Sequence, residues 1–265
     1  MVDIRMEPVG VVRGGTGDIY AMSKEGENAI VEVKPEYLPA LQRIGENSHL
    51  WIICWFDRAD RNVLQTMPRI MEPEPVDFGV FALRCFSRPN PIAITPVFLE
   101  KVEGNLLYVA GLDAIEGTPV LDIKPYFEQD SIFSPRTSYV RPKNEDTRRG
   151  LMHKLTYRHH RAESAALELG LSICLEAENH LGHLFDETIF VTVRGSRELA
   201  DVIQGITRAR LANPPRFTFN ETDSLDEVVF TKGDRRLKFT VKKRFSPDDD
   251  LRGLPANELF ILEVN

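Results

Sequence analysis

Apolar residues in the first half of the chain occur in short runs that are separated by glycine, proline and charged residues. These runs are rich in β-branched and aromatic side chains, which favour strands over helices. Many short strands with turn residues between them are typical of a β-barrel or a β-sandwich. One segment, about residues 35–45 with Pro35 near its start, has the spacing of a helix instead. The runs cover residues 29–33, 50–56, 79–83, 92–99 and 106–110.

The pattern changes after residue 150, where longer segments with helical spacing alternate with short apolar runs. Residues 160–177 are rich in Ala, Leu and Glu, and residues 197–211 repeat apolar positions with a helical period until Asn213-Pro214-Pro215. Helices and strands in this mixture predict an α+β domain. The predicted strands cover residues 187–193, 216–219, 227–230, 237–241 and 259–264.

Residues 128–150 separate the two patterns. They contain Pro135 and Pro142, many charges and little periodicity, which is the composition of a linker. We therefore predict a mostly β protein with a single β-barrel. The barrel domain is expected over residues 1–140, a linker over residues 141–152 and an α+β accessory domain over residues 153–265.

Composition narrows the class of protein. The chain has 33 Lys and Arg against 40 Asp and Glu, and its net charge of −7 argues against a broad basic surface for nucleic acid, though not against a local basic site. Its three cysteines form neither a disulfide framework nor a CxxC metal motif. No apolar run reaches the ~20 residues that cross a bilayer, and no apolar signal segment is visible near the N-terminus. These features predict a cytoplasmic protein with no membrane partner.

The segment from Phe78 to Ile94 concentrates arginine and proline. Pro89 and Pro91 each fix a φ angle and push the preceding residue toward an extended conformation. A rigid turn of this kind suits the binding of a small polar ligand, and Arg88 could bind a carboxylate through two hydrogen bonds. On local chemistry alone, an edge hairpin with solvated arginines is the simpler interpretation.

A second segment, residues 111–126, contains a turn and then a strand. Asp122 and Lys124 lie two residues apart, on one face of that strand. Asp122 could accept hydrogen bonds from a ribose or an amine, and Tyr126 could stack on a ring or donate a hydrogen bond. The alternative is an exposed Asp–Lys pair worth ~0–1 kcal/mol. His49 precedes an apolar strand, where a lone histidine is more often structural than catalytic.

Five blocks in the first half of the chain have a common interpretation. They are VGVVR at residues 9–13, SHLW at 48–51, GVFALR at 79–84, RPNPI at 88–92 and the segment from Asp113 to Tyr126. In this order and spacing the blocks, which cover roughly residues 6–140, resemble the TsaA-like, or TrmO, family of S-adenosylmethionine (SAM)-dependent tRNA adenosine N6-methyltransferases.

The resemblance implies that SAM binds to the β-barrel. The chain has no GxGxxG motif between a strand and a helix that would signal a dinucleotide fold instead. The resemblance also implies a homodimer with the cofactor near the subunit interface, and tRNA as partner, with N6 of a threonylcarbamoyladenosine beside the anticodon as methyl acceptor. The cofactor pocket that it implies consists of Phe81, Arg84, Arg88, Pro89, Asn90, Leu121, Asp122, Lys124 and Tyr126.

Catalysis with SAM mainly requires positioning. The sulfonium carries an activated methyl group, so the enzyme has to hold donor and acceptor in line at about 3–3.5 Å. A general base helps where the acceptor nitrogen carries a proton. Asp122, Tyr126 and His49 are the candidate catalytic residues, and the sequence does not distinguish among them.

Departures from the family pattern concern the acceptor. Gly14-Gly15-Thr16-Gly17 replaces the usual start of a long N-terminal loop, and the C-terminal half is not the short domain of bacterial members. With the negative charge, these departures leave two alternatives open: a SAM-dependent methyltransferase of a small-molecule acceptor, and a non-catalytic SAM-binding protein. A tRNA would need a local patch such as Arg84, Arg88 and residues 136–149, assembled across a dimer.

The C-terminal half contains a fainter pattern of histidines and helices. His159-His160, residues 166–170, residues 200–207 and a strand near residues 238–241 resemble one of the subunit families of formylmethanofuran dehydrogenase. Members of that family carry cysteines just after the histidine pair and just before the second helix. Other residues stand at those places here, and since a soft metal needs thiolates, we expect no metal. We interpret this half as a binding or dimerisation module.

Overall fold

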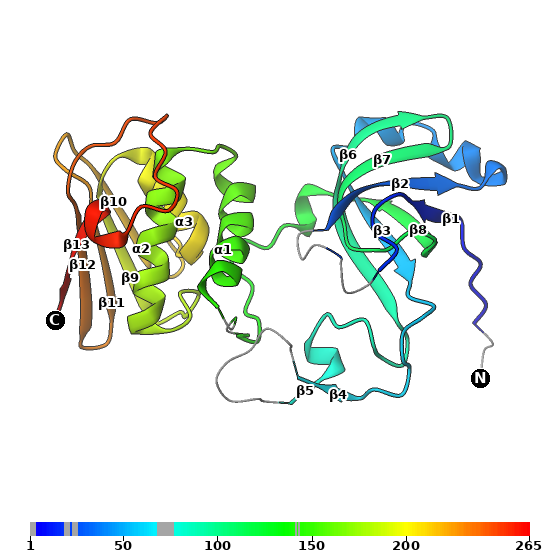
Figure 1. The fold of residues 1–265 in the computed structure, drawn as a ribbon, viewed down its shortest axis with the longest axis horizontal. Helices are drawn as coiled ribbons and strands as arrows, with labels where there is room; N and C mark the ends of the chain where they lie inside the picture. Colours follow the sequence, from blue (N-terminus) through cyan, green and yellow to red (C-terminus); the bar gives the residue numbers. More distant parts are fainter. Residues whose placement is uncertain (1–3, 19–21, 23–25, 68–76, 141, 143) are drawn as a thin grey trace. The chain divides into compact units, whose positions relative to one another are not determined.

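The computed structural model describes residues 4–18, 22, 26–67, 77–140, 142 and 144–265 (Figure 1). The chain divides into two compact units between Ile132 and Phe133. We call the described residues up to Ile132 the barrel unit and those from Phe133 to Asn265 the C-terminal unit. The sequence places the boundary further along the chain, within residues 141–152.

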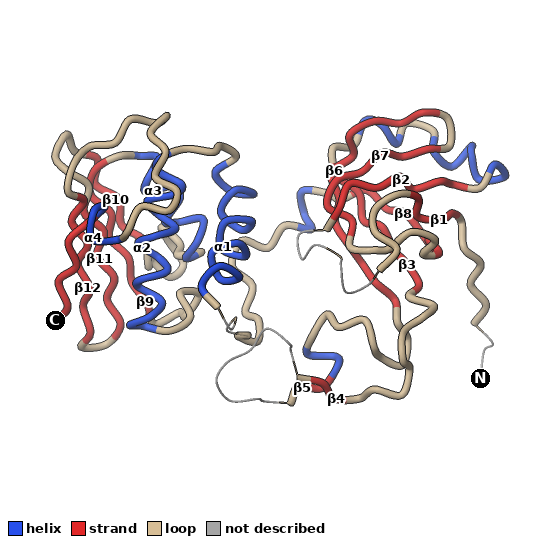
Figure 2. The backbone as a smooth tube through the Cα atoms, viewed as in Figure 1, coloured by secondary structure: helices blue, strands red, loops and turns tan. Residues whose placement is uncertain are grey.

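Six strands of the barrel unit form a closed antiparallel barrel (Figure 2). Neighbouring strands follow the order β1-β2-β7-β6-β3-β8, and β8 pairs with β1 to close the ring. Closure leaves no free strand edge, which confirms the prediction of a single β-barrel. The strands are β1 Gly10–Arg13, β2 Glu27–Val33, β3 His49–Trp55, β6 Ile92–Glu103, β7 Leu106–Leu112 and β8 Pro119–Pro125.

Alternating side chains fill the inside of the barrel. Along β3, Leu50, Ile52 and Cys54 are buried, and the residues between them face outward. Leu107 and Val109 of β7 belong to the same core. Burying an aliphatic side chain of this size contributes ~1.5–3 kcal/mol, so the inward face of each strand stabilises the barrel and the outward face is available for other roles.

The segment predicted as a helix at about residues 35–45 is not one α-helix. It forms two short 3-10 helices, Pro35–Leu41 and Ile44–Glu46, with Arg43 between them in the left-handed conformation. Pro39 lies inside the first of them and has no N–H group for an α-helical hydrogen bond. The proline therefore explains why the helical spacing does not produce a regular helix.

The predicted strand at residues 79–83 is also wrong. A two-residue strand, β5 (Phe78–Gly79), pairs with β4 (Gln65–Thr66) and is followed by a 3-10 helix at Val80–Ala82. A further 3-10 helix covers Glu128–Asp130. The apolar run at residues 79–83 is thus not part of the barrel wall.

A five-stranded sheet forms one layer of the C-terminal unit, and helices α1, α2 and α3 lie together along the sheet (Figure 1). The strand order is β10-β9-β11-β12-β13, in which only β9 and β10 run parallel. This mixture confirms the predicted α+β character. The elements are α1 Glu145–His160, α2 Ala165–Leu181, β9 Ile189–Gly195, α3 Arg197–Thr207, β10 Phe217–Glu221, β11 Glu227–Lys232, β12 Arg235–Val241, α4 Ala256–Leu259 and β13 Phe260–Val264.

Helix α1 is absent from the sequence prediction. Residues 145–152, expected in the linker, form its first half, and the helix predicted over residues 160–177 begins instead at Ala165. The α1 sequence is polar around most of its circumference, so its apolar period is weak. Its start is fixed by Asn144, whose Oδ1 accepts a hydrogen bond from the backbone N of Thr147 at 2.7 Å.

Close approach of the helices depends on glycine. A Cβ atom at Gly205 of α3 would lie 2.7 Å from Cδ2 of His159 on α1, and one at Gly170 of α2 would collide with Val202 of α3. Helices α1 and α2 therefore pack against α3 at points where a side chain has no room. Among the described residues, no helix has the length and apolar character that crossing a membrane requires.

Candidate functional site

One arginine holds the loop that follows β5. Arg88 Nε donates to the carbonyl oxygen of Cys85 at 3.1 Å, and Nη2 donates to that of Val80 at 2.6 Å and to that of Leu83. The guanidinium is thus largely occupied by the backbone of its own loop. This corrects the expectation that Arg88 presents its fork to a ligand carboxylate, and makes it the residue that positions Arg84.

The connection between β7 and β8 is a tight turn, as predicted. Gly117 has φ +84°, a left-handed conformation that glycine adopts without strain. Its N–H donates to the carbonyl of Val12 at 2.9 Å, and the N–H of Val12 donates to the carbonyl of Thr118 at 3.0 Å. These bonds to β1 fix the residues just before the turn, including Asp113, at one end of the barrel.

The two segments meet at a cavity of about 350 Å³ at that end of the barrel unit. This volume lies within the range of ~300–1,000 Å³ that is typical of small-molecule sites. Its walls come from the end of β3, the loop held by Arg88 and the β7–β8 connection. The lining residues are Met22, Phe56, Asp57, Arg58, Ala59, Arg84, Phe86, Asp113, Ala114, Ile115 and Thr118.

The cavity combines charges of both signs with aromatic rings. The Arg84 guanidinium forms no hydrogen bond or ion pair with any residue in the described part of the chain. Asp57 and Asp113 contribute carboxylates, and Phe56 and Phe86 contribute rings. A free cation, separate carboxylates and aromatic faces suit a zwitterionic amino-acid group attached to a planar ring system.

Asp122 and Lys124 lie together on the outer face of β8. Lys124 Nζ is 2.6 Å from Asp122 Oδ2, and the two side chains are 49% exposed for Asp122 and 60% for Lys124, so the ion pair contributes only ~0–1 kcal/mol. Asp122 Oδ1 accepts a hydrogen bond from the backbone N of Ile123 at 2.9 Å. Leu121 lies where the β3–β8 register shifts, since Asp122 pairs with Ile53 and Val120 with Cys54.

Aromatic side chains continue across this outer face. The Tyr126 ring centroid lies 5.1 Å from that of Trp51 and 6.3 Å from that of His49, and His49 meets Phe98 edge-on at 5.4 Å. His49 Nδ1 is 2.9 Å from Ser48 Oγ. The Tyr126 hydroxyl has no hydrogen-bond partner among the residues that the structure describes. Two candidate bases, Tyr126 and His49, therefore belong to one aromatic row.

The structure divides the predicted cofactor residues between the cavity and the outer face. Arg84 lines the cavity, whereas Leu121, Asp122, Lys124 and Tyr126 belong to β8 or directly follow it. Of the others, Phe81 is 83% exposed, Asn90 is exposed in the turn, and the carbonyl of Pro89 accepts a bond from Arg61 Nε at 2.9 Å. Their roles in cofactor binding stay predictions.

Three lining residues escaped the sequence analysis as site residues. Asp113 lies in a matched block, Phe86 lies between two matched blocks, and Asp57 directly follows the predicted strand at residues 50–56. A carboxylate at the end of a strand is a signal that could have found Asp57, because loops at strand ends carry many binding residues.

The positions of the fainter resemblance come together in the C-terminal unit. His159 Nε2 lies 3.1 Å from Asp201 Oδ1, and His160 Nδ1 lies 2.7 Å from Asp201 Oδ2. These contacts join the histidine pair at the end of α1 to the start of α3. The relation to formylmethanofuran dehydrogenase stays a prediction, and the contacts give the histidines a structural role.

A separate group, His153, Glu163 and Glu168, has potential ligand atoms within 4.8 Å of one another. Glu168 already accepts a hydrogen bond from Arg149, and Glu163 is 62% exposed. The group therefore resembles a surface ion-pair cluster, and we do not assign it a metal.

Comparison with known proteins places these features in a family. A family model described as the tRNA-methyltransferase O N-terminal domain matches residues 20–131. A probable S-adenosyl-L-methionine-binding protein of Methanothermobacter thermautotrophicus is 40% identical over 131 residues, which are 48% of this chain and 93% of that protein. The human tRNA (adenine(37)-N6)-methyltransferase is 38% identical over 119 residues, which are 43% of this chain and 26% of that protein.

One relative extends beyond the barrel unit. A second probable S-adenosyl-L-methionine-binding protein, from Archaeoglobus fulgidus, is 31% identical over 224 residues, which are 80% of this chain and 60% of that protein. An alignment of this length cannot be contained in the barrel unit. The similarity therefore includes much of the C-terminal unit, so the two units occur together in another chain.

Proposed function

This chain belongs to the family of the tRNA-methyltransferase O N-terminal domain, and from that premise we propose that it is a SAM-dependent methyltransferase that modifies an adenosine of tRNA. The resemblance that the sequence predicted is confirmed by the family match and by the relative that it covers to 93% at 40% identity. The observation that carries the proposal within the structure is the cavity of about 350 Å³, where two of the family's sequence blocks meet.

The cavity residues fit the parts of the cofactor. The Arg84 guanidinium suits the methionine carboxylate, and Asp57 and Asp113 suit the methionine amino group or the ribose hydroxyls. Phe56 and Phe86 offer faces for the adenine ring. SAM supplies an activated methyl group, so the task of these residues is to bind it and to point the reacting end toward the acceptor.

The choice of general base is part of the proposal. Asp122 is bound to Lys124, and His49 is beside Ser48, whereas Tyr126 keeps its hydroxyl free of partners within the described part of the chain. We therefore place Tyr126 first among the three candidates. A Tyr126→Phe variant should retain SAM binding and lose methyl transfer, whereas loss of both would assign Tyr126 to cofactor binding.

Cofactor binding is tested by thermal denaturation with SAM. A ligand at a hundred times its dissociation constant stabilises the folded state by ~2.7 kcal/mol, which raises the melting temperature. Arg84→Ala should weaken SAM binding by about tenfold or more, because a charge-assisted hydrogen bond is lost. Lys101→Gln, on the barrel surface away from the cavity, should leave binding unchanged. No shift of the wild-type protein at saturating SAM would overturn the proposal.

The methyl acceptor is tested separately. We expect label from methyl-labelled SAM to enter total tRNA, and digestion to nucleosides should locate it on a modified adenosine. The same assay with a metabolite extract distinguishes the alternatives. Transfer to a small molecule and not to tRNA would contradict the tRNA substrate, and transfer to neither would favour a non-catalytic SAM-binding protein.

A homodimer is the second part of the proposal. The outer face of β6 exposes Ile92, Ile94 and Phe98 by 39%, 45% and 44%, beside the outward residues of β3. Exposed apolar side chains in one row are typical of interaction surfaces. Because the aromatic row with Tyr126 lies on this face, a second copy would complete the surroundings of the candidate base. The cytoplasmic location stays a prediction.

Light scattering tests the dimer. Ile94→Lys should convert the dimer to a monomer, because a charge would be buried without a partner at the interface. Ile261→Lys, at an exposed position on β13 of the C-terminal unit, serves as the control and should leave the mass unchanged. A wild-type protein that is monomeric at all concentrations tested would contradict this part of the proposal.

A further inference from the structure

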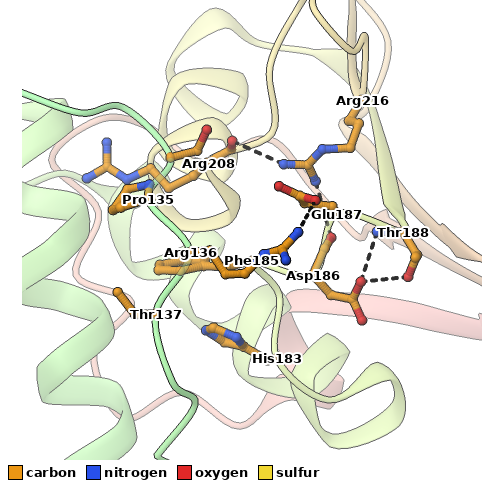
Figure 3. Close-up of a pocket in the computed structure, with 11 residues that line it drawn as sticks. Pro135, Arg136, Thr137, His183, Phe185, Asp186, Glu187, Thr188, Arg208 and Arg216 are labelled. Carbon is orange, nitrogen blue, oxygen red and sulfur yellow. Dashed lines mark hydrogen bonds and ion pairs between the residues drawn. The ribbon is translucent and has the colours of Figure 1, made fainter. Parts of the chain in front are cut away.

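A cavity of about 360 Å³ lies in the C-terminal unit beside the loop that joins α2 to β9 (Figure 3). Its walls come from residues 134–137, residues 183–188 and two arginines, Arg208 and Arg216. All of these residues belong to one compact unit. The cavity therefore does not depend on the barrel unit or on the function proposed above.

The carboxylates of this cavity are already paired with cations. Arg136 Nη2 lies 2.8 Å from Glu187 Oε2, as the dashed line in Figure 3 marks. Lys232 Nζ lies 2.9 Å from Asp186 Oδ2, and Thr188 Oγ1 donates to Asp186 Oδ1 at 2.7 Å. Neither acidic side chain remains to neutralise the other two arginines.

Arg216 is a buried cation without a carboxylate. It is 5% exposed, and Nη1 donates to the carbonyl oxygens of Asp186 at 3.2 Å and Ile189 at 3.1 Å. Nη2 donates to the carbonyl oxygen of Arg208 at 3.4 Å. The carbonyls satisfy its hydrogen bonds, but its positive charge is not cancelled and makes the surrounding cavity electropositive.

Arg208 is the second uncompensated cation. It is half-buried at the end of α3, and its guanidinium forms no hydrogen bond or ion pair within the described residues. Its nearest recorded partner is the Phe133 ring, whose centroid lies 5.5 Å from Cζ. Burial lowers the pKa of Arg208, although an arginine stays charged at neutral pH. In Figure 3 its side chain runs away from that of Arg216, so its donors remain available.

An apolar cavity of about 320 Å³ adjoins this site and shares Thr137, His183 and Phe185 with it. His183 stacks on Tyr139 at 4.2 Å between ring centroids and lies 4.8 Å from Phe185. Beyond these rings the walls are aliphatic, with Leu151, Met152, Leu155, Leu184 and Ile206. The two cavities together thus have a cationic end and an apolar end.

We propose that the C-terminal unit binds a small organic anion, with its phosphate or carboxylate group at Arg208 and its apolar body against Phe185. Hydrogen-bond donors outnumber free acceptors at the cationic end, which selects an anion over a cation or a neutral polar ligand. The adjoining rings and aliphatic chains exclude water from the body of the ligand, which selects an organic anion over a bare inorganic ion.

Calorimetric titration of the full chain tests this site. Phenyl phosphate is the probe with both parts, inorganic phosphate has the anion alone, and benzyl alcohol has the ring alone, all at constant ionic strength. Phenyl phosphate should bind more tightly than either partial probe. Arg208→Gln should weaken it about tenfold or more, because one charge-assisted contact is lost. Phe185→Ala should reduce its affinity toward that of inorganic phosphate.

Arg194→Gln is the matched control, since Arg194 is an exposed arginine on β9 that lines neither cavity. Its affinity should stay within about twofold of the wild type, since an exposed distant charge is screened. The unliganded melting temperatures show whether each variant is folded, and Arg208→Lys, which keeps the charge, should retain part of the affinity. Absence of phenyl phosphate binding to the wild type, or equal weakening in the Arg208 and Arg194 variants, would overturn the proposal.

Discussion

His160 Nδ1 lies 2.7 Å from Asp201 Oδ2, and only 8% of the histidine side chain is exposed. The same carboxylate contacts Nε2 of His159 at 3.1 Å through its other oxygen. His160 Nε2 is in turn 3.3 Å from the hydroxyl of Ser164, the residue that caps α2. One carboxylate on α3 therefore ties the end of α1 and the start of α2 into a single polar network.

Removing this carboxylate should destabilise the C-terminal unit. Asp201→Ala leaves the ring nitrogens of two largely buried histidines without their acceptor, which should lower the free energy of unfolding by about 1–3 kcal/mol. Urea denaturation followed by circular dichroism measures the change. Asp248→Ala, at an exposed position, should change it by less than about 0.5 kcal/mol. Equal stability of the two variants would show that the network contributes nothing.

The buried pair of Arg148 and Glu178 should matter more than a surface pair. Arg148 Nε and Glu178 Oε2 are 3.6 Å apart with side chains 7% and 8% exposed, and Tyr139 also donates to Glu178 at 3.0 Å. Glu178→Ala leaves a buried guanidinium uncompensated, which should cost about 3–5 kcal/mol. Glu221→Ala breaks the exposed pair with Arg197 and should cost only about 0–1 kcal/mol in the same urea experiment. A ratio near one would refute the distinction.

Arg88 should act as a positioning residue of the barrel cavity. Arg88→Lys replaces a fork that reaches three carbonyls by a single ammonium, so we expect looser packing of the loop that carries Arg84. The variant should lose about 1–2 kcal/mol of stability and also bind SAM more weakly. Arg84→Lys, in contrast, should lower SAM affinity with little effect on the melting temperature, and the two profiles would be indistinguishable if Arg88 contacted the cofactor directly.

The three thiols should differ sharply in reactivity. Cys54 and Cys174 are buried, and burial raises the pKa of Cys54 to about 12. Cys85 is partly exposed. Since the thiolate is the reactive form, an aromatic disulfide reagent at pH 8 should modify one thiol in the folded protein and three in denaturant. Cys85→Ser should abolish the fast phase, and persistence of that phase would place the accessible thiol elsewhere.

Stability should fall in mildly acidic solution through His183. Burial lowers its pKa below the usual 6.5, and Lys232 lowers it further, while Asp186 opposes this. Below pH 6.5 the unfolded chain therefore takes up this proton before the folded chain does, so the free energy of unfolding decreases as the pH falls. Denaturant titrations between pH 7.5 and pH 5.5 should show a smaller decrease in His183→Gln. Identical pH profiles would remove His183 from this role.

The alternation of apolar residues predicted most barrel strands correctly, because a period of two places one face of each strand in the core. It identified β3 through Leu50 to Phe56 and the turn at Gly117, and the matched blocks identified the family. It failed at residues 79–83, where the apolar run is a 3-10 helix held by Arg88, and at α1, where polar residues hide the helical period.

The candidate sites depended on tertiary structure. The sequence pointed to Arg84 and Asp122 as members of one pocket, but the structure puts Arg84 in a cavity at the barrel end and pairs Asp122 with Lys124 on the outer face. It also left Arg208 and Arg216 unremarked, because each is one arginine among many. What singles them out is the lack of a carboxylate nearby, and the distance between residues remote in sequence is set only by how the chain packs.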